Sequence, residues 1–216
     1  MTHATAGDVT SATGGPTATR RSARREATRT RLMQAAVDVF AERGFHGASV
    51  EDICERAGFT RGAFYSNFSS KDDLVLALYD QHIDRLSARV ESLAGREEAD
   101  PGTILEGVFD VWSHSPREQA RWFLLQTEFT LHAIRDADAR RTWAAQQRRV
   151  RDELVSVVDE AVSRQGLTLP IPTDIFVRVA IALAQGSMTQ RLVEPRSLAV
   201  GELERTVLPI LLGVGR

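Results

Sequence analysis

The sequence contains a single cysteine, Cys54, and a single lysine, Lys71, among 27 basic residues in a chain of 216. One cysteine excludes an intramolecular disulfide and a zinc site built on several cysteines. No apolar run reaches the roughly 18 residues that a membrane-spanning helix needs. These absences are typical of a protein of the reducing cytosol, and we expect a cytoplasmic location.

Charge is unevenly distributed along the chain, although the net charge is only −2. Residues 1–71 carry 10 basic and 7 acidic residues, whereas residues 72–216 carry 17 and 22. This asymmetry indicates an N-terminal part that binds an anionic partner and a C-terminal part with a different function. The first 20 residues lack the apolar core of a secretory signal, and we expect residues 1–23 to form a disordered basic N-terminal arm.

The hydrophobic pattern predicts an all-α protein. Between residues 24 and 43, apolar residues recur at the spacing of one helix face, and strand-like alternation is not sustained anywhere. Polar caps and glycines delimit the segments that follow. We expect a DNA-binding domain at 24–70 and a larger helical domain at 71–216. The predicted helices span 24–43, 50–57, 61–68, 71–93, 103–114, 117–134, 137–164, 173–192 and 198–212.

Two short capped helices joined by the sequence Gly58-Phe59-Thr60 predict a helix-turn-helix. In the second helix, Phe64 and Phe68 point inward, so that Arg61, Gly62, Tyr65 and Ser66 are left outward. A face that offers guanidinium, phenol and hydroxyl groups, with a glycine for close approach, suits phosphates and base edges. A face that is only solvated would more often carry glutamate, lysine or glutamine.

Lys71 stands in the first turn of a predicted helix, where a cation opposes the helix dipole. One explanation is a phosphate held jointly by the lysine and by the free amides of the helix start. The other is a local pair between Lys71 and a neighbouring aspartate. The residue alone does not decide between the two.

The stretch AAVDVFAERGFHGASVEDICERAGFTRGAFYSNFSSKDDLVLAL resembles the N-terminal domain of the tetracycline-repressor (TetR) family of bacterial transcription regulators. The resemblance covers residues 24–78, and it includes Gly44, Gly58, the aromatic motif of residues 64–68 and the lysine that opens the fourth helix. It implies a three-helix DNA-binding domain, joined to a helical domain that binds a ligand and dimerises. The partners would then be double-stranded DNA with a palindromic operator, a second copy of the chain and a small-molecule effector.

The resemblance also assigns roles to single residues. Arg25 and the neighbouring arginines would lie near the DNA backbone, and Ser49 would cap its helix and touch a phosphate. Tyr65 and Lys71 would bind phosphates, and Asn67 would point outward near the backbone. The major groove would be faced by Thr60, Arg61, Gly62 and Ala63. Arg61 is the candidate for base reading, because arginine pairs bidentately with guanine. The DNA-binding residues expected are Arg25, Ser49, Thr60, Arg61, Gly62, Ala63, Tyr65, Asn67 and Lys71.

Aromatic and polar side chains on the later helices predict a pocket for a small, mainly apolar effector. The alternative for each residue is that aromatics at helical spacing belong to the core. The predicted pocket residues are Trp112, Trp122, Phe123, Gln126, Phe129, Phe176 and Gln185.

The last two helices carry small residues and an apolar stripe, which predict a dimer surface. We expect a ligand-responsive dimeric regulator, with repression as the family default, which the effector releases from its operator. On DNA, it would be associated with the nucleoid. A helical interaction or small-molecule-binding module that has lost DNA binding is the alternative. We expect no catalytic residues, metal or cofactor, because no catalytic motif or metal-ligand spacing is present. Cys54 has two interpretations, a buried structural thiol or a redox sensor.

Overall fold

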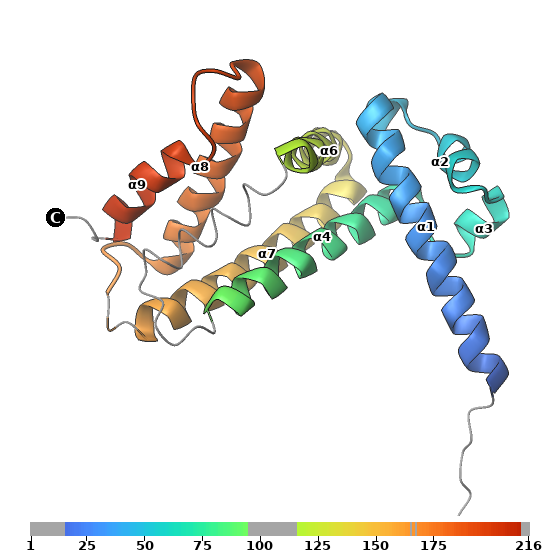
Figure 1. Cartoon of the computed structure of the whole chain (residues 1–216), viewed down its shortest axis with the longest axis horizontal. Helices are drawn as coiled ribbons and strands as arrows, with labels where there is room; N and C mark the ends of the chain where they lie inside the picture. The colour runs from blue at the N-terminus through green and yellow to red at the C-terminus, as the bar shows by residue number, and fades with distance from the viewer. Residues whose placement is uncertain (1–15, 95–115, 165, 167, 213–216) are drawn as a thin grey trace, which may run out of the picture.

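The computed structural model describes residues 16–94, 116–164, 166 and 168–212, and its regular elements there are α-helices. The first three helices and the C-terminal helices lie at opposite ends of the molecule, with long helices between them (Figure 1). The prediction of an all-α protein is therefore confirmed. The helices are α1 (Pro16–Gly47), α2 (Val50–Ala57), α3 (Arg61–Tyr65), α4 (Lys71–Ala94), α6 (Pro116–Arg135), α7 (Ala137–Arg164), α8 (Thr173–Val193) and α9 (Glu202–Leu212).

Local capping explains where the short helices begin and end. Ser49 accepts a hydrogen bond from the backbone N–H of Asp52, and the Asp52 carboxylate accepts one from the N–H of Ser49. This reciprocal pair is the predicted capping box. Gly58 ends α2 in the left-handed conformation, with φ of 71°. Thr60 caps α3 by accepting from the N–H of Ala63.

Four helix boundaries differ from those predicted by more than one residue. Two of them are the ends of α1 and α3, which lie at Gly47 and Tyr65 instead of residues 43 and 68. Helix α1 begins at Pro16 instead of residue 24, so residues 16–23 of the expected disordered arm are helical. Helix α9 begins at Glu202, later than residue 198, because Gly201 adopts a φ of 72° just before it. The Glu202 carboxylate also accepts a hydrogen bond from the N–H of Ala199, which fixes this turn. The predicted helix at 103–114 lies outside the described residues.

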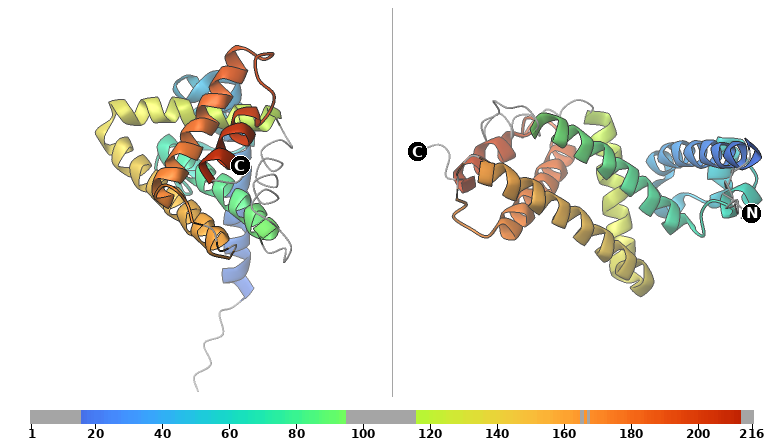
Figure 2. Two further views of the ribbon diagram at one scale, coloured as in Figure 1. Left: turned by 90° about the vertical axis from the view of Figure 1, so that its left-hand side faces the viewer. Right: turned by 90° about the horizontal axis from the view of Figure 1, so that it is seen from below.

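A single hydrophobic core joins the predicted DNA-binding domain to the helices that follow it. It runs from Leu32 and Phe64 through Leu78 to Phe129 and Trp143, without a break at residue 70. A second, smaller core lies among α7, α8 and α9. Helices α4 and α7 contact each other in the middle of the molecule, and α6 contacts both α1 and α7 (Figure 2). Helix α6 is therefore packed directly against α1.

Helices α4 and α6 are also connected by a stacked pair of rings. The His82 and Trp122 rings lie 4.4 Å apart between centroids, at an angle of 24°. Burial lowers the pKa of His82 below its ordinary value of 6.5, with a smaller opposing effect of Glu118. The imidazole is therefore neutral in the folded protein at neutral pH.

This stack predicts a pH-dependent stability. Below pH 6.5 the unfolded chain binds a proton at His82 more readily than the folded chain does, so stability falls as pH decreases. The contribution is at most about 1.4 kcal/mol per pH unit. His82→Phe keeps an aromatic ring against Trp122 and removes the titration. Between pH 7.5 and 5.5, urea unfolding should show a smaller decrease in the free energy of unfolding for this variant than for the wild type. Equal decreases would show that His82 does not cause the pH dependence.

None of the described helices is both long enough and apolar enough to cross a membrane.

Candidate nucleic-acid interface

The surface of α3 presents the side chains that the sequence predicted. Phe64 and Phe68 are buried in the core, and this fixes the rotation of α3. Arg61, Gly62 and Tyr65 are exposed on the opposite side, and half of the Tyr65 surface is accessible. The result is a short helix with a phenol and a guanidinium pointing to solvent.

Gly62 occupies a position that the fold itself does not reserve for glycine. Its φ is not positive, and a Cβ atom added there would meet only the Thr60 hydroxyl, at an ordinary distance of 3.7 Å. Alanine would therefore fit the described structure. A missing side chain on an exposed helix face leaves room for a surface that approaches from outside.

Arg25 lies on helix α1, within its regular part, and not on a flexible arm. Its guanidinium donates to the backbone carbonyl of Ser66. Arg29 donates likewise to the carbonyl of Asn67, and Arg31 to that of Ala57. These bonds tie α1 to the ends of α3 and α2, where carbonyls lack partners within their own helix. The expected contact of Arg25 with DNA remains a prediction, since Arg25 already bonds to the end of α3.

Asn67 does not point outward as predicted. Its side chain is half-buried, and its amide group donates to the carbonyl of Ala63 at 2.8 Å and to the Ser66 hydroxyl. Its side-chain oxygen is buried and has no hydrogen-bond partner within the described part of the chain. The residue follows the end of α3, where its amide satisfies a free carbonyl. The outward orientation predicted from the sequence is therefore wrong.

Lys71 binds two backbone carbonyls, a contact that was not among the alternatives drawn from the sequence. Its ammonium group donates to the carbonyl oxygens of Phe45 and Ala48, at 2.6 and 2.8 Å, and lies 4.3 Å from the centre of the Phe45 ring. The predicted pair with an aspartate is therefore absent from the described structure. Burial lowers the pKa of Lys71, and the neighbouring Asp72 opposes this shift. An ammonium group has three donors, so one remains for the expected phosphate contact.

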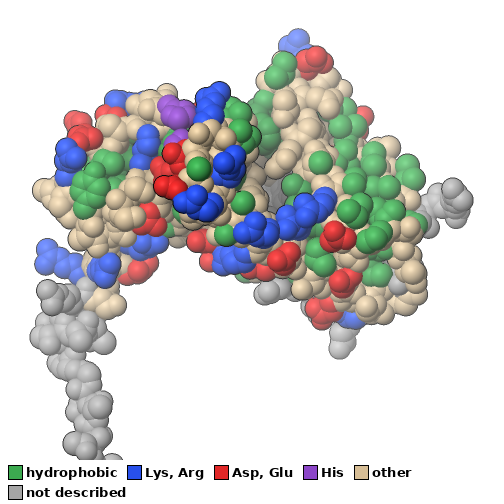
Figure 3. All heavy atoms as spheres, turned by 180° about the vertical axis from the view of Figure 1, so that it is seen from behind, with side chains coloured by type: hydrophobic (Ala, Val, Ile, Leu, Met, Phe, Trp, Pro, Cys, Tyr) green, Lys and Arg blue, Asp and Glu red, His purple; other side chains and the backbone are tan. Residues whose placement is uncertain are grey.

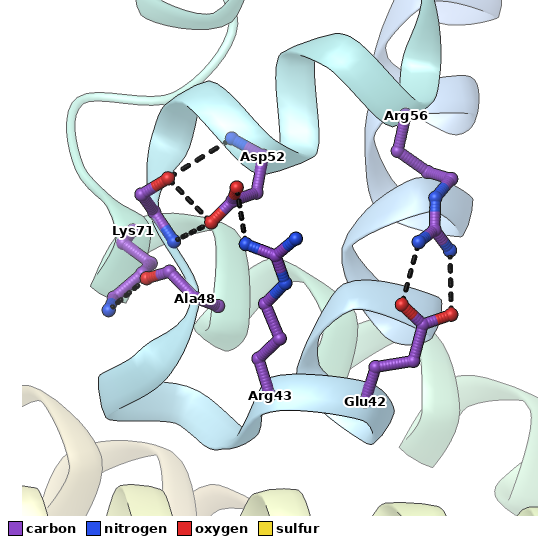
Figure 4. A network of polar contacts seen from close by, with 7 residues as sticks. Glu42, Arg43, Ala48, Asp52, Arg56 and Lys71 are labelled. Atoms are coloured by element: carbon purple, nitrogen blue, oxygen red, sulfur yellow. Dashed lines mark hydrogen bonds and ion pairs between the residues drawn. The ribbon is translucent and has the colours of Figure 1, made fainter.

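Ion pairs hold the helix-turn-helix against α1 (Figure 4). Arg43 bonds the capping residue Asp52 at 2.6 Å, and Arg56 binds the Glu42 carboxylate with two hydrogen bonds. The pKa of Asp52 is lowered, first by its bonds to Ser49 and then by Arg43. Ser49 uses its hydroxyl both to donate to and to accept from Asp52. The hydroxyl that is expected to contact a phosphate is therefore already hydrogen-bonded within the helix cap.

The turn at Gly44, near the end of α1, is bound by a residue of α6. A carboxylate oxygen of Glu128, on α6, accepts the N–H of Phe45 at 2.5 Å. Gly44 has φ of 70° and ψ of 170°, and an added Cβ atom would lie 2.7 Å from the same carboxylate oxygen. His132, also on α6, lies 2.9 Å from Asp72 in the first turn of α4. Helix α6 therefore bonds both to the end of α1 and to the start of α4.

Phe45 is the centre of this junction. Its side chain is 2 % exposed and contacts the rings of Phe129 and His132, at centroid distances of 5.2 and 5.0 Å. Its N–H is bound by Glu128 and its carbonyl by Lys71. Neither Phe45 nor Glu128 was among the site residues predicted from the sequence, because the contact between them joins residues 83 positions apart.

The predicted effector-pocket residues do not share one cavity within the described structure. Phe129 packs against Phe45 and Trp143 in the first core, whereas Phe176 lies in the second core, and Gln185 is exposed. Trp122 stacks on His82. Phe123 and Gln126 are partly exposed on α6, and Trp112 lies outside the described residues. The pocket expected from Trp112 to Phe129, closed by Phe176 and Gln185, therefore stays a prediction, with Phe129 and Phe176 in different cores of the described residues.

Cys54 is buried, and burial raises the pKa of its thiol, assisted by the nearby Glu51 carboxylate. A raised pKa disfavours the reactive thiolate. In the ranges that the structure covers, no three histidine, cysteine or acidic side chains are grouped to hold a metal ion.

Comparison with known proteins finds a family model and relatives that match the N-terminal helices. Residues 32–78 match the model of bacterial regulatory proteins of the tetR family. The HTH-type transcriptional activator FasR of Mycolicibacterium smegmatis is 41% identical over 66 residues, 31% of this chain and 30% of FasR, so this chain spans less than a third of that relative. The HTH-type transcriptional repressor AcnR of Corynebacterium diphtheriae is 26% identical over 148 residues, 68% of this chain and 72% of AcnR.

The fold as a whole has a solved counterpart. The structure of Salmonella enterica GusR superposes with a TM-score of 0.68, covering 87% of this chain and 96% of GusR at 22% identity. This likeness extends the agreement from the N-terminal helices to the helical fold of 87% of the chain. The resemblance drawn from the sequence is confirmed.

Proposed function

We propose that this chain, which carries a DNA-binding helix-turn-helix of the tetR family, is a dimeric, ligand-responsive transcriptional regulator that binds a palindromic operator. The observation that carries the proposal is the exposed face of α3, where Arg61 and Tyr65 flank a glycine that the fold does not require. FasR is named an activator and AcnR a repressor, and we keep repression as the default for this chain.

Exchange of Gly62 for alanine separates folding from DNA binding. Alanine is more favourable than glycine inside a helix by about 0.8–1.0 kcal/mol, and the added methyl group has room. We therefore expect Gly62→Ala to leave the urea midpoint unchanged or raise it, and to weaken binding to the preferred duplex about tenfold or more, because the methyl group meets the DNA. Fluorescence anisotropy provides the affinity. Unchanged affinity for that duplex would contradict the close approach of α3.

The surface of α8 and α9 supports the proposed dimer. Hydrophobic side chains gather at this end of the molecule (Figure 3), and Val193 and Ile210 are 75% and 71% exposed. Gly186 lies within α8, and apart from its chain neighbours and the backbone of its own helix, no atom of the described chain comes within 4 Å of the position of its absent Cβ. A glycine inside a helix destabilises it, and its open surroundings leave space for the helix of a second copy.

Ile210→Glu tests this surface. A carboxylate buried without a partner in an apolar interface is strongly unfavourable, so we expect sedimentation equilibrium to show a monomer at concentrations where the wild type is a dimer. Ile134→Glu is the matched control, because Ile134 is 61% exposed on α6, outside the proposed surface. The proposed interface is wrong if both variants remain dimers, or if both dissociate.

The effector, proposed to be small and mainly apolar, would act through the contacts of α6. Glu128 and His132 connect this helix to the end of α1 and to the start of α4. Trp122, Phe123 and Gln126 lie on the same helix, so a molecule that binds beside them would shift it. A ligand changes DNA affinity only if it binds the two conformations with different affinity. An effector that saturates the protein without altering operator affinity would contradict this part of the proposal.

A further inference from the structure

Arg61, the residue expected to read a base, is already bound to a carboxylate. Its Nη1 atom lies 2.7 Å from Oε1 of Glu51, which stands in the first turn of α2. Its Cζ atom lies 5.8 Å from the centre of the Tyr65 ring. The guanidinium group is therefore placed between a carboxylate and a phenol on the surface of the helix-turn-helix. Gly62 and Ala63 are small and Phe64 is buried, so Arg61 is the cation of α3 that can reach a groove.

This ion pair is not needed to hold the two helices together. The Arg61 and Glu51 side chains are 61% and 56% exposed, and exposed ion pairs contribute little to stability. Buried residues such as Ile53 and Phe64 fix the packing of α2 against α3. The other acidic residue in the first turn of α2, Asp52, forms the helix cap. Glu51 takes no part in this cap.

A carboxylate on a DNA-binding surface weakens binding to every duplex, because it repels the phosphates. Its pairing with Arg61 can compensate for this only at the right base. The guanidinium group has five N–H donors, so one edge can stay on Glu51 while the other bonds O6 and N7 of guanine. A side chain that is already oriented loses less conformational freedom on binding. At a wrong base pair, Arg61 has to leave Glu51 for a phosphate, and the carboxylate is then left unpaired beside the DNA.

We propose that Glu51 is a positioning residue that sets base-pair preference: it orients Arg61 for a guanine and penalises binding in which Arg61 contacts only phosphate. The inference rests on the proposed DNA-binding function and adds a second residue, on α2, to the reading of one base pair. The specificity of the protein then depends on a carboxylate that does not increase its affinity.

The test uses the full-length protein and a duplex selected from a random-sequence library by the wild type. Affinities are measured by anisotropy for this duplex, for its single-base-pair variants and for an unrelated duplex. The proteins are the wild type, Glu51→Gln, Glu55→Gln, Arg61→Ala and the double variant Glu51→Gln/Arg61→Ala. Glu55 is an exposed glutamate on the same helix, so its replacement makes the same change in charge.

Glu51→Gln should reduce the preference for the selected base over its replacements about fivefold at one base pair, the equivalent of up to about 1 kcal/mol. This base pair should be the one at which Arg61→Ala loses preference. Glu55→Gln should raise affinity for all duplexes without changing the preference. In the Arg61→Ala background, Glu51→Gln should alter the preference no further. Equal effects of Glu51→Gln and Glu55→Gln, or an effect that persists without Arg61, would overturn the inference. A wild type that selects no duplex would instead overturn the proposed function, and the inference with it.

Discussion

Replacing Gly44 with alanine is expected to lower the free energy of unfolding by about 2–4 kcal/mol. Two effects combine at this position. The backbone has φ of 70° and ψ of 170°, a conformation that residues with a side chain rarely adopt. The new methyl group would also lie 2.7 Å from the Glu128 carboxylate, which binds the N–H of Phe45. Alanine therefore strains the turn and displaces its partner from α6.

Gly47→Ala is the matched control for this measurement. Gly47 lies three residues further on, its φ is not in the left-handed region, and an added Cβ atom would meet only the side chain of Arg43 at 3.6 Å. We expect this variant to change the unfolding free energy by less than about 1 kcal/mol. Urea unfolding compares the two variants, in the wild-type and Glu128→Ala backgrounds. If Gly44→Ala costs the same in both backgrounds, the clash with Glu128 contributes nothing, and if it costs no more than Gly47→Ala, the whole account of the turn is wrong.

Lys71→Met is expected to lower the unfolding free energy by about 1–3 kcal/mol, because the carbonyls of Phe45 and Ala48 lose their donor. The methionine keeps most of the apolar length of the side chain, so the loss reports the ammonium group. The same variant should lower the slope of the logarithm of DNA affinity against salt by up to about one unit per half-site, if the remaining donor binds a phosphate.

Arg24→Met serves as the control for Lys71, because Arg24 is an exposed cation on α1. It should leave stability within about 0.5 kcal/mol of the wild type. A stable Lys71→Met variant would show that the two carbonyls do not depend on the ammonium group. A salt slope that stays at the wild-type value would remove the phosphate contact predicted from the sequence, while leaving the structural role intact.

The parts of the fold that depend on neighbouring residues were predictable from the sequence. The capping box of Ser49 and Asp52 joins residues three positions apart, and the Gly58 turn follows directly after α2. The inward direction of Phe64 and Phe68 follows from their spacing within one turn. Such local signals also led to the exposed face of α3 and to the family resemblance.

The remaining features depend on contacts that no local pattern contains. Lys71 bonds a carbonyl 26 residues away, and Glu128 reaches a backbone N–H across 83 residues. From the neighbouring sequence alone, Lys71 and Glu128 could equally well be solvent-exposed charged residues. The early start of α1 was different, since Pro16 at a first helical position is a favourable start signal that the sequence does show. Phe129 and Phe176 have the spacing of a pocket wall, but they belong to two separate cores.

The central claim is that the helix-turn-helix binds one DNA sequence in preference to others. Its most direct test is anisotropy of the wild-type protein, across a salt series, on a duplex recovered from a random library and on an unrelated duplex of equal length. We predict affinity on the order of 10 nM or tighter for the first, with weaker binding to the second and a steep fall with salt on both. Weak and equal binding to the two duplexes would contradict the account, and would instead support a helical module that has kept the fold without DNA binding.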